Sequence, residues 1–152
     1  MKKHKSGYTV IELLVTILLI GIFSSIALLR AEPLFAFQEN RSFELQVKEI
    51  VSTLEEERHL SMLDGNRRQI YFFRDKIYLQ TIDLAKGVST RKITYQNGLT
   101  ITGNTYQGGT LLFYPWGTVN KGGHVTFVSP NGLQQTLVVQ IGSGRMYLRE
   151  GE

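Results

Sequence analysis

The chain of 152 residues contains no cysteine. This absence excludes a disulfide framework, an iron–sulfur cluster and any zinc site that depends on thiolate ligands. Proline is also scarce, with three residues, whereas glycine occurs 15 times. A composition that is 42% hydrophobic and 20% charged is typical of a folded chain rather than a disordered one. The length suits one modest domain that can bury its own core.

Acidic residues are missing from a long C-terminal stretch. Between Leu84 and Arg149 there are six basic residues and no aspartate or glutamate. No carboxylate acid–base pair can therefore arise within this segment. The sequence also lacks a phosphate-binding loop, a nucleophile elbow and a metal-ligand spacing. We therefore expect that the protein is not an enzyme, and that it has no catalytic residues, no metal site and no cofactor.

The apolar residues are concentrated near the start of the chain. Residues 8–29 include one charged side chain, Glu12, among 22 residues. As a helix this segment would span about 33 Å, close to the ~30 Å of a bilayer core. The lysines that precede it favour a cytoplasmic N-terminus, with the C-terminal part outside. The segment predicts a single-pass membrane helix, for which an ordinary signal anchor or a cleaved secretory signal is the alternative interpretation.

The residues around Glu12 form a recognisable motif. Residues 5–12 read KSGYTVIE, which is a basic leader, glycine, an aromatic residue, threonine, two apolar residues and glutamate. Together with the apolar run that follows, this sequence resembles the type III signal of prepilins. The resemblance covers the first 30 residues. It indicates the type IV prepilin and pseudopilin superfamily.

This resemblance implies a processing pathway and a set of partners. Prepilin peptidase would cut after Gly7 on the cytoplasmic side, and Tyr8 would become the N-methylated first residue in place of the usual phenylalanine. Glu12 would direct assembly by pairing with the Tyr8 amine of a neighbouring subunit, because an unpaired charge in a filament core is costly. The implied partners are other pilins or pseudopilins of the filament, the peptidase and the membrane platform of pilus assembly.

Beyond the apolar run, the pattern predicts that the helix continues to Leu63 with a bend at Pro33. One helix over residues 8–63 would be about 84 Å long. From Glu39 onward its apolar positions follow helical spacing, at Phe43, Val47, Ile50 or Val51, and Leu54. We expect Gly65 to end the helix. The glutamates at positions 44, 49, 55, 56 and 57 are expected to form a solvated opposite face.

After Asn66 the apolar period changes to two, and glycine-rich turns separate short segments. The alternation predicts an antiparallel β-sheet laid on the helix, so the expected fold class is α+β. The expected organisation is a leader over 1–7, a membrane and filament-core helix over 8–29, an amphipathic helix over 30–65 and a β headgroup over 66–152. The expected strands are Gln69–Phe73, Lys76–Ile82, Arg91–Tyr95, Leu99–Gly103, Leu111–Tyr114, His124–Val128, Thr136–Ile141 and Met146–Arg149.

The closing strands carry a second resemblance. The sequence GRMYL at residues 144–148 follows a glycine-marked loop, and with the strands before it resembles the minor pseudopilin family of type II secretion tips and type IV pili. The leader, size and lack of cysteine look most like competence pilus minor pilins of Gram-positive bacteria (ComGD type). This implies a pilus subunit that takes part in uptake of transforming DNA. A type II secretion pseudopilin and a membrane-anchored binding module are the alternatives.

The charges are divided along the chain. Residues 30–64 hold four basic and eight acidic residues, whereas the charged residues in 84–149 are all basic. In one interpretation the sheet's cations face the helix's acids. In the other, a basic surface contacts DNA phosphates, with base stacking on Tyr106, Tyr114 and Trp116 if these are exposed. The candidate DNA or partner contacts are Arg91, Lys92, Lys121, Arg145 and Arg149.

Overall fold

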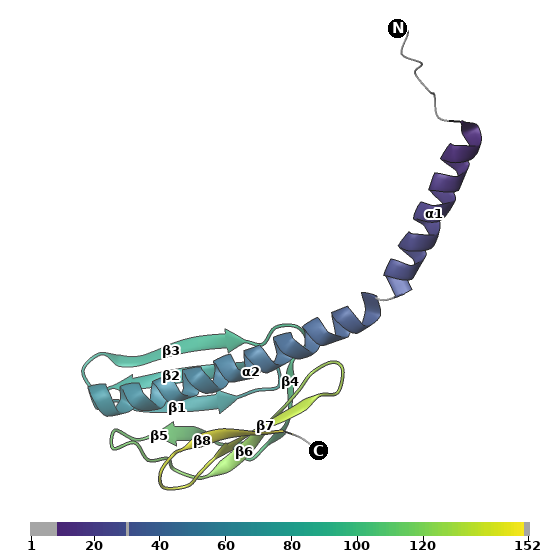
Figure 1. Ribbon diagram of the computed structural model, residues 1–152. Coiled ribbons are helices and arrows are strands. Elements are labelled where there is room, and N and C mark those ends of the chain that lie inside the picture. Colours follow the sequence, from purple (N-terminus) through teal and green to yellow (C-terminus); the bar gives the residue numbers. More distant parts are fainter. Residues whose placement is uncertain (1–8, 30, 151–152) are drawn as a thin grey trace. The chain divides into compact units, whose positions relative to one another are not determined.

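A computed structural model describes residues 9–29 and 31–150 (Figure 1). Over these residues the chain has mixed helix and antiparallel sheet content, as the α+β prediction expects. It divides into two compact units, residues 1–38 and residues 39–152, which are described separately. The elements in chain order are α1 (Val10–Leu29), α2 (Ala31–Asp64), β1 (Arg67–Phe72), β2 (Lys76–Asp83), β3 (Gly87–Thr94), β4 (Thr100–Asn104), β5 (Leu111–Phe113), β6 (Gly123–Val128), β7 (Gln134–Val139) and β8 (Met146–Glu150).

The helix that the sequence predicts to be continuous is described in two pieces, because residue 30 lies outside the described residues. Here α1 ends at Leu29 and α2 begins at Ala31. Pro33 lies within α2, and the bend predicted at this residue stays a prediction.

α1 is almost entirely apolar in sequence. Large apolar side chains are exposed along its length, from Val10 to Leu28. Across the residues that the structure describes, no helix combines the length and the apolarity needed to cross a membrane. The membrane span predicted over residues 8–29 is therefore not shown by the structure.

In the second unit, the predicted face of α2 is the buried one. Phe43, Val47, Ile50 and Leu54 are all buried, and Val51 packs against them from the edge of this stripe. The helix ends at Asp64, and Gly65 follows with a φ of 72°. This left-handed conformation carries little steric cost for glycine, so the predicted end of the helix is confirmed.

The strands form two antiparallel sheets rather than the single sheet that was predicted. One has the order β3-β2-β1-β5 and the other has the order β4-β6-β7-β8. The eight strands correspond to the eight predicted ranges, with ends shifted by a few residues. β4 pairs with β6, and β5 pairs with β1.

α2 and both sheets contribute to one hydrophobic core. Within residues 39–150 the helix runs along strands of both sheets (Figure 1). Alternate residues of each inner strand point into this core, as Val125 and Phe127 do in β6. Complete burial of one such side chain contributes about 1.5–3 kcal/mol. The sheets are therefore fixed to the helix by apolar packing along most of its length in this unit.

Candidate functional site

Glu12 lies in the first turn of α1 and caps it. Its Oε2 accepts a hydrogen bond of 3.4 Å from the backbone N–H of Thr9. In return, the Thr9 carbonyl accepts bonds from the N–H groups of Glu12 at 3.0 Å and Leu13 at 3.2 Å. This arrangement is half of a capping box, with threonine at the N-cap and glutamate three residues later. The carboxylate also lies at the positive end of the helix dipole.

Two further polar side chains of α1 bond within the helix itself. The Thr16 hydroxyl donates to the Leu13 carbonyl at 2.7 Å, and the Ser25 hydroxyl donates to the Gly21 carbonyl at 2.9 Å. Glu12 is the single charged residue of α1. The helix therefore presents one carboxylate at its N-terminus and an otherwise apolar surface. Gly7 and Tyr8, the predicted cleavage and methylation residues, lie outside the described residues.

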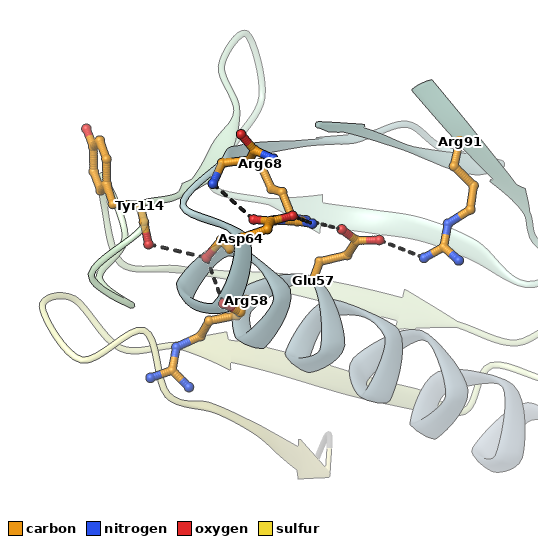
Figure 2. A network of polar contacts seen from close by, with 8 residues as sticks. Glu57, Arg58, Asp64, Arg68, Arg91 and Tyr114 are labelled. Carbon is orange, nitrogen blue, oxygen red and sulfur yellow. Dashed lines mark hydrogen bonds and ion pairs between the residues drawn. The ribbon is translucent and has the colours of Figure 1, made fainter. Parts of the chain in front are cut away.

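A second polar site joins the end of α2 to the first sheet (Figure 2). Arg68 of β1 donates from Nε to Glu57 at 2.7 Å and from its two terminal nitrogens to Asp64 at 2.9 and 2.6 Å. The other oxygen of Glu57 accepts from Arg91 of β3 at 2.8 Å. Two carboxylates of the helix thus bind two arginines of the sheet.

Burial makes this ion-pair network different from a surface salt bridge. The side chains of Arg68 and Glu57 are 6% and 9% exposed. The hydrogen bonds from Arg68 hold the pKa of Asp64 well below its usual range. The bonds to Asp64 likewise raise the pKa of Arg68, so both groups stay charged. Removing one partner of such a buried, hydrogen-bonded pair is costly, because it leaves the other charge buried without a partner.

Sequence analysis placed Glu57 on the solvated face of the helix, and that expectation is wrong. Its position continues the buried spacing of Val47, Ile50 and Leu54, and Ser61 continues it by one more turn. A polar residue at helical spacing from an apolar stripe was the signal that could have identified both. Arg68 was not singled out, although it lies at period-two spacing from Ile70 and Phe72, the buried apolar residues of β1.

Polar groups next to this network fix two loops to α2. Arg58 donates to the carbonyl of Gly117 at 3.1 Å and to the carbonyl of Ser143 at 2.9 Å. The Ser61 hydroxyl lies 3.3 Å from the Tyr114 carbonyl (Figure 2). Gly117 and Ser143 lie in the loops after β5 and before β8, so the helix end contacts both sheets.

The predicted basic contacts are distributed over different elements. Arg91 and Lys92 belong to β3, an edge strand of the first sheet, whereas Arg149 belongs to β8, an edge of the second. Arg145 is exposed in the turn before β8. Lys121 donates to the Thr105 carbonyl at 3.3 Å and lies 5.2 Å from the centre of the Tyr106 ring. Arg91 has an acid of α2 as its partner, which is what the intramolecular interpretation of the charges expects.

The three aromatic candidates differ in exposure. Tyr106 is 1% exposed and stacks on Phe72, with ring centroids 5.7 Å apart. Burial raises the pKa of Tyr106 to about 12. Trp116 is 66% exposed and stacks on Tyr114 at 4.9 Å with an interplanar angle of 5°. Only the Tyr114–Trp116 pair can therefore offer a surface for stacking, and Tyr106 serves the core.

Comparison with known families gives a match at the N-terminus of the chain. Residues 2–28 match the family described as the prokaryotic N-terminal methylation motif. The motif indicates a protein of the type IV pilin or pseudopilin type. It also suggests a membrane-anchored N-terminus, processing by prepilin peptidase and pilin partners in general. Comparison with curated proteins and with solved structures gave no significant match.

Proposed function

We propose that this protein is a minor pilin of a competence type IV pilus that takes part in pilus assembly and in uptake of transforming DNA. The observation that carries the proposal is the methylation motif at residues 2–28. The narrower assignment to a competence pilus of the ComGD type is supported by the C-terminal resemblance, the short lysine-rich leader and the absence of cysteine.

Processing is the first step of this function. The proposal places the uncut chain in the cell membrane with its C-terminal part outside, anchored through residues 8–29. Prepilin peptidase then cuts after Gly7, where the absence of a side chain leaves the scissile bond accessible. Methylation of the new Tyr8 amine follows. The cut removes three lysines, Lys2, Lys3 and Lys5, which would otherwise hold the N-terminus at the cytoplasmic face.

Assembly is the second step, and Glu12 is the residue that we assign to it. Its carboxylate is exposed at the start of α1, and its hydrogen bond to Thr9 holds it there. The Tyr8 amine of a neighbouring subunit would supply the cation that a carboxylate needs in an apolar filament core. The exposed apolar side chains of α1 supply the surface that such a core buries.

Deletion of the gene tests which filament system the subunit serves. We expect transformation to fall by several orders of magnitude while the set of secreted proteins stays unchanged, and a plasmid copy should restore transformation. Loss of secretion with normal transformation would instead assign the chain to a type II secretion pseudopilin. Normal transformation and normal secretion would favour an anchored binding module and contradict the proposal.

A further inference from the structure

One end of the second unit has a shallow groove. This unit begins at Glu39 within α2, and α2 ends at Asp64. The groove lies beside Asp64, at the C-terminal end of this helix. Three segments that are distant in sequence line it, and Figure 1 shows the β2–β3 turn beside the end of α2. Its volume is about 400 Å³, and its lining includes Asn66, Arg67, Gln69, Leu84, Pro115 and Trp116. Such a volume accommodates a small molecule or one unit of a polymer.

A cation and two rings are stacked at this groove. The Arg67 guanidinium lies 5.9 Å from the centre of the Tyr114 ring, and Trp116 stacks on the same ring. The loop holds the stack in place, because Gly117 N–H donates to the Tyr114 carbonyl at 2.9 Å and Tyr114 N–H donates to the Thr118 carbonyl at 3.0 Å. Gly117 has a φ of 83°, which favours glycine. The exposed indole is thus preorganised before any ligand arrives.

Two large apolar side chains at the groove are exposed to solvent instead of packing in the core. Leu84 is fully exposed in the β2–β3 turn, and Trp116 is two thirds exposed. Both line the groove. Exposed aromatic and aliphatic groups with a few polar groups beside them are typical of a binding surface.

The charges at the groove favour an anionic ligand. The four members of the ion-pair network (Glu57, Asp64, Arg68 and Arg91) neutralise one another. The Asp83 carboxylate accepts the N–H groups of Ala85 and Lys86, and forms no ion pair within residues 9–29 and 31–150. Arg67 also forms no ion pair among those residues, and Lys86 adds a second cation in the β2–β3 turn. The groove therefore carries a net positive charge of one beside its aromatic stack.

We infer that this groove binds single-stranded DNA, with one base stacked on Trp116 and a neighbouring phosphate near Arg67. A base has the flat aromatic face that the indole accepts, and its phosphate matches the cation. A duplex keeps its bases stacked on one another, so only the single strand can fill the groove in this way. The inference rests on the proposed role in DNA uptake and assigns a contact for it.

The fluorescence of the chain tests this inference directly, because Trp116 is its one tryptophan. The full-length protein in mild detergent is titrated with a twelve-residue oligothymidylate and, separately, with a duplex of the same length. We expect saturable quenching by the single strand and at least tenfold weaker binding of the duplex. Raising the salt concentration should weaken the binding, because the inferred contact includes at least one phosphate, and phosphate contacts weaken as salt rises.

Matched variants locate the contact, with the anisotropy of a labelled oligonucleotide as the readout. Trp116→Ala should weaken binding about tenfold, within the range of stacking energies measured by alanine substitution, and Trp116→Phe should retain most of the affinity. Arg67→Ala should weaken it about threefold. Tyr147→Ala changes an exposed residue of β8 in the other sheet and should leave binding unchanged.

Three results would overturn the inference. Equal binding of duplex and single strand would replace base stacking by phosphate attraction alone. Quenching by a maltohexaose or by an apolar peptide, with none by the oligonucleotide, would make the groove a glycan or protein site. Unchanged binding by Trp116→Ala would place the contact elsewhere. None of these results affects cleavage after Gly7, so failure here is distinguishable from failure of the proposed function.

Discussion

Glu12 meets two physical requirements at one position. The first N–H groups of a helix lack partners within the helix, and Glu12 supplies an acceptor to one of them. A carboxylate on an apolar helix also needs a cation once the helix is buried in a filament. Glutamine can serve the first requirement but not the second, because it accepts a hydrogen bond and carries no charge.

Glu12→Gln and Glu12→Ala therefore separate the two roles. We expect both variants to lower incorporation into sheared pili at least tenfold, because both remove the charge that pairs with the neighbouring amine. Quantitative immunoblotting of the pilus and membrane fractions measures this. Normal incorporation of Glu12→Gln with loss of Glu12→Ala would reduce Glu12 to a helix cap, and normal incorporation of both would refute its role in assembly.

Replacement of Glu57 by an uncharged residue should destabilise the second unit, because Glu57 pairs with two arginines. Glu57→Gln leaves buried Arg68 with Asp64 alone and releases Arg91. Breaking a buried ion pair in this way should cost about 3 kcal/mol of unfolding free energy. Urea unfolding of the full-length protein in mild detergent measures the cost. The control is Glu56→Gln, an exposed neighbour, which should change stability by about 0.5 kcal/mol or less.

Asp64 gives the network a defined pH dependence. Its pKa is lower in the folded state, chiefly through the hydrogen bonds from Arg68, so its stabilising effect is complete above the unfolded pKa of about 3.9. That effect is lost as the pH falls below this value toward the folded pKa. The urea midpoint of wild type should therefore exceed that of Asp64→Asn by a constant amount from pH 7 to pH 5. The difference should be smaller at pH 3 than at pH 5, and an undiminished difference at pH 3 would contradict the assignment.

At the scale of elements, local pattern was enough to locate the strands but not their partners. The period-two segments and the glycine turns identify all eight strands of the described residues, and the spacing of Phe43, Val47, Ile50 and Leu54 identifies the buried face of α2. The division into two sheets depends on the pairing of β5 with β1, across about forty residues of chain. Such pairing depends on how distant segments pack in three dimensions, and the apolar periodicity of one strand does not indicate its partner.

Two leucines of α2, one buried and one exposed, test which face of the helix packs on the sheets. Leu54 is 1% exposed in the core, whereas Leu45 is 55% exposed on the same helix. Leu54→Ala should lower the unfolding free energy by about 2–5 kcal/mol, because it removes buried surface and leaves a cavity. Leu45→Ala should have little effect in the same urea titration. Equal effects of the two changes would mean that the helix packs through a different face.

At the scale of the whole molecule, the net charge of +4 conceals a division between segments. Acids are concentrated on α2 and bases on the strands, and the contacts of Glu57 and Asp64 with Arg68 and Arg91 join the two groups within one unit. The bases that remain exposed, such as Lys92 and Arg149, lie on different sheets. A single continuous basic surface is therefore not required to explain the composition.

The two candidate sites also differ in how far sequence could reveal them. The N-terminal motif is contiguous, so the order of its residue types was enough to name Gly7, Tyr8 and Glu12 as candidates. The groove beside Asp64 is built from three separate segments, and only the fold brings Arg67, Leu84 and Trp116 together. The sequence named Trp116 as a stacking residue only on the condition that it is exposed, which the structure satisfies.

The central claim is that the chain is processed as a pilin. Mass spectrometry of the protein recovered from sheared pili, with an N-terminal peptide map, tests it most directly. A strain without prepilin peptidase serves as the control and should retain residues 1–7. The account predicts a mature chain that begins at Tyr8 and carries one methyl group on its amine. An intact N-terminus, or a cut after any residue other than Gly7, would contradict it.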